Sequence, residues 1–274
     1  MVPGARQIFG KFQADRGPQL GAMIAYYALL SFVPLIFITV SIFGLFGRTN
    51  ESSSFVKKLG HIFPDSSLTS IAATVNAIQD HATLIGILGL LFLVWSSLSL
   101  FGAFESAFNI VYGRPNRSFV TGKIYAALLL LLMLVFLFVG LTIATIGYGQ
   151  LEKIAPGISG NSIAGYALPI VVSSVAVFVF LLCVYYYLTN VEHTVGDVLP
   201  GAILATVLLE ITFQALPAYL RLSRGSTAQQ AFGGPVLLLV WLYLMANVTV
   251  LGAELNWYRA RHRVRVREDV PGLA

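Results

Sequence analysis

The sequence contains a single cysteine, Cys183, and few charged residues. One cysteine excludes an intrachain disulfide and any zinc site built from cysteines, and its place inside an apolar run makes it a small core residue. Charged residues make up only 11% of the 274 residues, against roughly 25% in an ordinary soluble domain. A soluble fold with so little charge would expose apolar surface on every side, which excludes the soluble globular class.

The sequence also lacks the motifs of common catalytic and cofactor sites. It has no glycine-rich phosphate loop, no nucleophile elbow and no paired-histidine zinc motif. Glu192, His193 and Asp197 are its only cluster that resembles metal ligands, and three residues in one short loop are a weak signal. Asp197 also fits the N-cap of a helix whose first turn holds Pro200. We therefore expect no enzyme and no bound metal or cofactor.

What the sequence does contain is long apolar runs. Hydrophobic residues make up 57% of the chain, and its mean hydropathy is +0.81. A helix over each of six charge-poor runs is long enough to cross a hydrocarbon core of roughly 30 Å. The predicted fold class is therefore an all-α polytopic membrane protein. We expect a single membrane domain over 1–262 and a basic tail over 263–274, with six spans at about 21–46, 84–111, 124–151, 163–188, 198–220 and 233–258.

The basic residues predict how the chain is oriented. An even number of spans puts both termini on one side, and eleven of the 17 Lys and Arg residues lie in segments on that side. The positive-inside rule then places both termini in the cytoplasm. Residues 1–20, with Arg6, Lys11 and Arg16, are expected to form an amphipathic helix on the inner leaflet. The basic tail is expected to face anionic lipid, and not nucleic acid.

The first span and the segment after it have particular features. Pro34 cannot donate a backbone hydrogen bond to the carbonyl of Leu30, so we expect a kink there, with Ser31 helping to satisfy the freed group. Between residues 49 and 83, apolar residues recur at helical spacing on either side of Pro64. This pattern predicts two short amphipathic helices in the first outer loop.

Small residues at spacings of three and four lie on several spans. Such strips let neighbouring helix backbones approach closely, so they predict helix contacts. The strips are Gly21, Ala25 and Ala28; Ser99, Gly102 and Ser106; Gly140, Ala144 and Gly147; and Ala246, Thr249 and Ala253.

Three carboxyl groups lie inside the spans, at Glu105, Glu210 and Glu254. An ionised side chain at the centre of a span costs on the order of 3 kcal/mol, so each of them needs an explanation. Each has an amide on its own helical face, and these amides are Asn109, Gln214 and Asn247. Glu210 lies nearest the midplane, and we predict that it binds a substrate or titrates a proton while the other five residues line a polar cavity.

Depth in the membrane leaves alternatives open for these acids. Glu105 and Glu254 lie near the cytoplasmic ends of their spans, and the favoured role for both is to hold helix ends together. Arg114 and Arg117 are candidate partners of Glu105. For Glu210 the alternative is a protonated, hydrogen-bonded strut. The transport hypothesis needs the three carboxyls to converge on one hydrated cavity without a cationic partner.

Four stretches together are similar to a known family. They are AYYALLSFVPL, FGAFESAFNIVYGRPNR, LPGAILATVLLE and AFGGPVLLLVWLYLMANVTVLGAELN, and they resemble the YihY family, also called the virulence factor BrkB family. The resemblance implies a six-helix bacterial inner-membrane protein with both termini in the cytoplasm. Members often carry the label ribonuclease BN, which we do not carry over because no catalytic constellation supports it. This chain departs from many relatives in having Glu192 and His193, in place of basic residues, between the fourth and fifth spans.

Two functions are compatible with these features. The first is a transporter, or a protein that moves a lipid or another amphiphile in the cell envelope, with membrane lipids and a small-molecule or amphiphilic substrate as its ligands. The alternative is a membrane scaffold or envelope-assembly factor whose outer segment, residues 51–83, binds another protein. Homo-oligomerisation is compatible with both. A cavity favours the first function, and closed seams of small residues favour the second.

Overall fold

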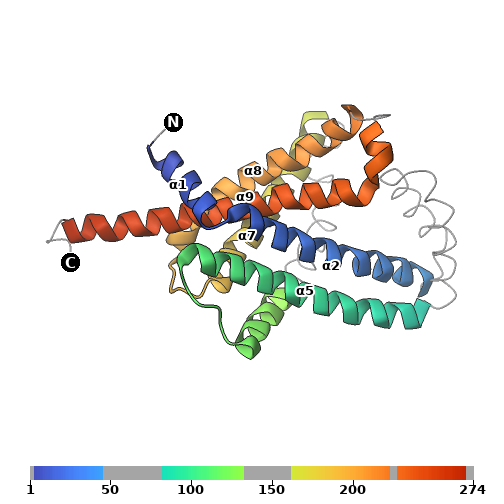
Figure 1. Cartoon of the computed structure of the whole chain (residues 1–274). Coiled ribbons are helices and arrows are strands. Elements are labelled where there is room, and N and C mark those ends of the chain that lie inside the picture. Colours follow the sequence, from blue (N-terminus) through green and yellow to red (C-terminus); the bar gives the residue numbers. More distant parts are fainter. Residues whose placement is uncertain (1–2, 46–81, 133–161, 223–226, 270–274) are drawn as a thin grey trace, which may run out of the picture. The chain divides into compact units, whose positions relative to one another are not determined.

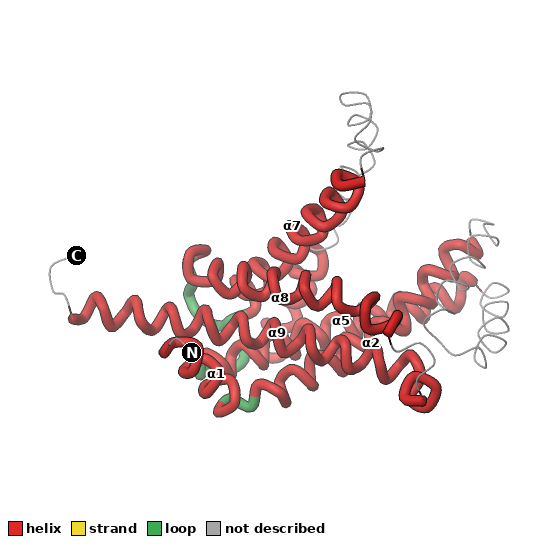
Figure 2. Tube along the Cα trace, turned by 90° about the horizontal axis from the view of Figure 1, so that it is seen from above, coloured by secondary structure: helices red, strands yellow, loops and turns green. Residues whose placement is uncertain are grey.

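A computed structural model describes residues 3–45, 82–132, 162–222 and 227–269, and this part of the chain is helical apart from short connections (Figure 2). The all-α class is confirmed. The helices are α1 (Pro3–Ala14), α2 (Gly17–Leu45), α5 (Ala82–Tyr112), a helix over Phe119–Leu132, α7 (Ser162–Leu188), α8 (Val195–Leu222) and α9 (Thr227–Asp269).

Three stretches of these helices are long and apolar enough to cross a membrane. They are Ile87–Tyr112, Val195–Ala215 and Val236–His262, and two shorter apolar stretches cover Phe119–Leu132 and Ser173–Leu188. Large apolar side chains are exposed along these helices, as expected of surfaces that face lipid; examples are Leu88, Leu91, Val207, Ile211 and Val240.

The helix bounds agree with four predicted spans to within a few residues, for α2, α5, α7 and α8. α9 is longer than predicted, because it continues unbroken through residues 263–269 of the predicted tail. The outer-loop helices expected between 49 and 83 and the second half of the span at 124–151 lie outside the described residues. The count of six spans therefore stays a prediction.

The chain divides into two compact units. The first consists of residues 1–17, 104–211 and 248–274, and the second of residues 18–103 and 212–247. Within the first unit α1 crosses the C-terminal half of α9 (Figure 1), and a methyl group on Gly4 would lie 3.2 Å from the Tyr258 hydroxyl. Helix α1 and the C-terminal half of α9 are therefore in contact within this unit.

Local sequence signals fix where α5 ends and α8 begins. Gly113 has a φ of +64°, and its N–H donates to the Ile110 carbonyl while that of Arg114 donates to the Asn109 carbonyl. These two bonds form a Schellman motif, which needs a residue in the left-handed region and so favours glycine.

The start of α8 corrects the role predicted for Asp197. Thr194 is the N-cap, and Asp197 is the third helical residue, whose carboxylate accepts hydrogen bonds from the Thr194 N–H (3.0 Å) and hydroxyl (2.7 Å). This is the acidic half of a capping box, and it also places a negative charge at a helix N-terminus.

The core of the first unit contains aromatic and small residues. Phe108 and Tyr185 are buried with their ring centroids 5.1 Å apart. α8 and α9 meet at Gly201 and Gly252, where a Cβ added to Gly201 would lie 2.1 Å from the carbonyl oxygen of Gly252. The two backbones are therefore in direct contact.

In the second unit α2 packs on α9 through its predicted strip of small residues. Gly21 is buried, and a Cβ there would lie 2.7 Å from Nδ2 of Asn247. Pro34 lies within the continuous helix α2. The Ser31 hydroxyl donates to the Tyr27 carbonyl at 3.0 Å, so the prediction that it satisfies Leu30 is wrong. This is the common hydrogen bond from the hydroxyl of a helical serine to the carbonyl four residues earlier.

Candidate functional site

The carboxyl groups predicted to share a cavity each have a separate partner. Glu105 pairs with Arg117, Glu254 pairs with Lys11, and Glu210 accepts a hydrogen bond from Ser173. Two of the three carboxyls therefore have a cationic partner, contrary to what the transport hypothesis required. Their roles in binding a substrate or a proton stay predictions.

Glu105 and Arg117 join the end of α5 to the end of α7. Oε1 of Glu105 accepts from the Arg117 N–H at 3.1 Å and lies 3.5 Å from its Nη1. The guanidinium also donates to the carbonyls of Leu188 (2.7 Å) and Thr189 (3.0 Å), the last turn of α7 and the residue after it. A cation suits this position, because the last carbonyls of a helix carry partial negative charge. Arg117, one of the two predicted candidates, is thus the partner of Glu105.

Asn109 is the centre of a second set of contacts at this end. Its side chain is fully buried, and Oδ1 accepts from the Asn190 N–H at 2.7 Å while Nδ2 donates to Oδ1 of Asn116 at 3.1 Å. Asn116 in turn donates to the Ser106 hydroxyl, and Asn190 donates to the Pro115 carbonyl. This network holds the connections 113–118 and 189–194 against each other.

We predict that Asn109→Ala lowers the stability of the protein by about 1–3 kcal/mol, because it leaves the Asn190 N–H without its acceptor. Denaturant unfolding of the purified protein in detergent measures the change. Asn116→Ala is the matched control, since Asn116 is exposed and water can replace its partners. Equal losses in the two variants would contradict a central role for Asn109.

Glu254 and Lys11 join α9 to α1. The Glu254 side chain is 0% exposed, and its Oε2 lies 3.1 Å from Nζ of Lys11. The same Nζ donates to the Val111 carbonyl at 2.8 Å, forms an ion pair with Asp15, and lies 4.2 Å from the centre of the Trp257 ring. Lys11 was expected to face the inner leaflet as part of α1. Its side chain instead points into the protein, where it pairs with the buried Glu254 carboxylate.

Two residues further along α9, Asn256 joins this helix to α8. Its Oδ1 accepts from the N–H of Gly201 at 2.6 Å, and the Tyr185 hydroxyl donates to the Thr249 carbonyl at 2.7 Å. Like Lys11, Asn256 was not among the predicted site residues. Asn256 is an amide two residues after Glu254 in an apolar stretch, which was a signal in the sequence. The two side chains leave α9 on nearly opposite sides, and both are buried.

Glu210 has a different environment. It is half-buried within the span Val195–Ala215 of α8, and both of its carboxylate oxygens lie 3.3–3.4 Å from the hydroxyl of Ser173, an exposed residue of α7. Gln214, one turn further along α8, is also exposed. Asn247, the remaining predicted residue, packs on Gly21 and donates to the Tyr243 carbonyl at 2.7 Å.

No group of three or more His, Cys, Asp and Glu side chains within the described residues is arranged to hold a metal ion. Glu192, His193 and Asp197, the weak candidates in the sequence, therefore do not form such a set.

Comparison with known proteins finds one matching family and relatives that are named membrane proteins. The family model described as Virulence factor BrkB matches residues 8–272. A UPF0761 membrane protein of Laribacter hongkongensis is 28% identical over 91% of this chain and 59% of its own length. One from Alkalilimnicola ehrlichii is 29% identical over 92% and 58%. YfkH of Bacillus subtilis, named as ribonuclease-like, is 25% identical over 92% of this chain and 93% of itself.

The chain thus spans about three fifths of the length of these UPF0761 relatives. No solved structure matches the chain.

Proposed function

Because this chain belongs to the virulence factor BrkB family of integral membrane proteins, we propose that it moves a lipid or another amphiphile across or within the bacterial inner membrane. In this proposal it has no enzymatic role, needs no cofactor and does not bind nucleic acid. The ligand reaches it from the membrane.

The observation that carries the proposal is the position of Glu210. An acidic side chain inside an apolar span is expensive unless it meets water or polar groups. Glu210 is half-buried, its polar neighbour Ser173 is exposed on α7, and Gln214 is exposed one turn away. Polar groups on the outside of apolar helices are expected where a headgroup or water enters the membrane region.

The test is lipid movement by the purified protein in liposomes, followed with a headgroup-labelled lipid and a quencher that cannot cross the membrane. We expect Glu210→Gln to reduce the rate at least tenfold and Ser173→Ala to reduce it less. Ser99→Ala is the matched control, because among the described residues its hydroxyl donates within α5, to the Trp95 carbonyl. Full activity of a correctly inserted Glu210→Gln protein would reject this role.

A second function, a membrane scaffold, is supported by the first unit. In it the Glu254 side chain is fully buried beside Lys11, and the backbones of α8 and α9 meet at Gly201 and Gly252. In that case the wild-type protein moves no lipid, and a partner or a second copy of the chain is recovered after crosslinking in the membrane.

A further inference from the structure

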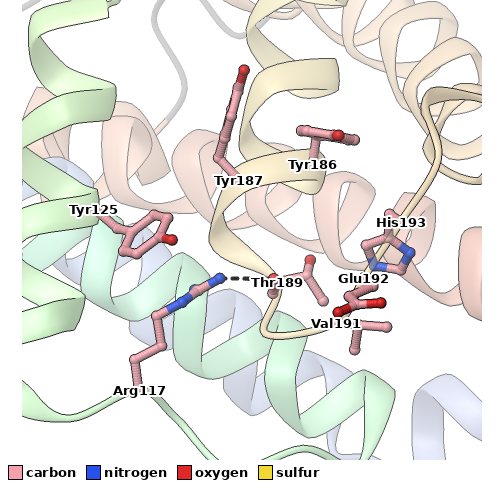
Figure 3. Close-up of a pocket in the computed structure, with 8 residues that line it drawn as sticks. All are labelled: Arg117, Tyr125, Tyr186, Tyr187, Thr189, Val191, Glu192 and His193. Atoms are coloured by element: carbon pink, nitrogen blue, oxygen red, sulfur yellow. Dashed lines mark hydrogen bonds between the residues drawn. The ribbon is translucent and has the colours of Figure 1, made fainter.

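A pocket of 260 Å³ opens between the helix Phe119–Leu132 and the connection that follows α7. Figure 3 shows Arg117 and Tyr125 on one side of it and Glu192 and His193 on the other. All of these residues belong to the first unit. The volume lies just below the range of pockets that take drug-sized ligands, so it suits a smaller polar group.

Arg117 presents a fixed cation to this pocket. Its guanidinium has five N–H donors, and the bonds to Leu188, Thr189 and Glu105 involve three of them. The ring of Tyr125 lies 4.3 Å from its central carbon and fixes its plane. Within the described residues the remaining N–H groups have no acceptor, and a planar guanidinium with free donors suits a phosphate.

The opposite side of the pocket carries a negative charge. Glu192 is exposed and forms no ion pair with Arg117 or with another cation in the described part of the chain. Tyr186 and Tyr187 also line the pocket, and tyrosine rings attract ammonium groups. A ligand that fits both sides carries a phosphate and an amine a short distance apart.

His193 adds a neutral polar group beside Glu192. Its Nε2 is buried and has no hydrogen-bond partner among the described residues, and its ring packs on Tyr112 at 4.9 Å. Burial lowers the pKa of His193, although Asp197 opposes this effect. Near neutral pH the imidazole is therefore uncharged, so it does not repel an ammonium group.

The surroundings of the pocket indicate a lipid as the source of that group. The pocket lies at the ends of two apolar stretches, Phe119–Leu132 and Ser173–Leu188. Ile124 and Leu128, on the helix that carries Tyr125, are 53% and 58% exposed. Acyl chains of a membrane lipid can cover these side chains while its headgroup occupies the pocket.

We propose that this pocket binds the headgroup of an aminoalkyl phospholipid, with the phosphate on Arg117 and the ammonium on Glu192. The inference deepens the proposed function, on which it rests for a lipid as the ligand. It identifies the class of lipid that the protein handles.

The test is binding of phosphatidylethanolamine and phosphatidylglycerol to the full-length protein in detergent, measured by native mass spectrometry. Both lipids carry the phosphate, but only the first carries the amine. We expect the wild-type protein to prefer phosphatidylethanolamine about tenfold, the size of effect expected when one charged contact is lost. Glu192→Gln should abolish the preference and leave binding of phosphatidylglycerol unchanged.

Asp15→Asn is the matched control, since it removes the same charge from a residue of the first unit that does not line the pocket, and it should keep the preference. Arg117→Lys supplies a second variant, because it retains the charge while losing the two-pronged phosphate contact, and it should weaken the binding of both lipids. Equal binding of the two lipids by the wild-type protein, or an unchanged preference in Glu192→Gln, would overturn the proposal.

Soluble phosphoethanolamine distinguishes a lipid from a free metabolite. We expect it to compete weakly, and binding of the soluble compound without the lipid would overturn the lipid assignment. Failure of the two proposals is also distinguishable. Preferential binding without lipid movement rejects the transport function alone, and lipid movement without headgroup preference rejects the pocket assignment alone.

Discussion

Lys11→Met is expected to destabilise the protein by about 3–5 kcal/mol, the range for removing one partner of a buried ion pair. The substitution leaves the Glu254 carboxylate fully enclosed without its cation, and it also removes the donor to the Val111 carbonyl. Methionine has nearly the length of lysine, so the loss of packing is small. Denaturant unfolding in detergent measures the change.

A double variant separates charge from packing in this experiment. Within the described residues Glu254 has a close cation but no donor with good hydrogen-bond geometry on either oxygen. Such a pair gains little over apolar side chains of similar size, so Lys11→Met with Glu254→Leu should recover most of the stability lost in Lys11→Met alone. Arg6→Met, at an exposed basic residue of the same helix, should change the stability by less than about 0.5 kcal/mol. A double variant as unstable as the single one would contradict this account.

The positions of the helices could be predicted because the length of an apolar run is a local property of the sequence. The error at the end of α9 has an equally local cause. Arginine at every second position from Arg259 to Arg267 ends the hydropathy signal, but arginine is a good helix former. The helix therefore continues to Asp269 after the apolar stretch has ended.

The partners of the buried acids were harder to predict than the acids themselves. Arg117 follows Glu105 closely, beyond a turn that the Gly113 Schellman motif fixes, and it was a candidate from the sequence. Lys11 is separated from Glu254 by most of the chain. No spacing rule connects them, because only the packing of α1 on α9 brings their side chains together.

The strips of small residues also did not identify which helices would meet. Gly21 makes the close helix contact that its strip predicted, whereas a Cβ on Gly102 would meet no atom within 4 Å among the described residues. The backbone contact between Gly201 and Gly252 lay outside the predicted strips. A strip shows which face of a helix can be approached, but the identity of the partner helix depends on the tertiary fold.

Gly201→Ala is expected to lower the stability by 3 kcal/mol or more, at the upper end of the roughly 1–3 kcal/mol typical of overpacking. The added Cβ would lie 2.1 Å from the Gly252 carbonyl oxygen and 2.5 Å from the Asn256 amide. A backbone carbonyl in a helix cannot rotate away, so α8 and α9 must separate, and the bond from the Gly201 N–H to Asn256 must lengthen.

Gly102→Ala is the matched control for this substitution. It adds the same methyl group inside an apolar helix, at a position where no described atom lies within 4 Å. The higher helix propensity of alanine should leave the stability unchanged or raise it by up to about 1 kcal/mol. Thermal and denaturant unfolding of both variants in detergent give the comparison. Because the residue types exchanged are identical, a large loss in Gly201→Ala alone assigns the effect to the contact between the two backbones. Equal stabilities in the two variants would show that α8 and α9 do not meet at this glycine pair.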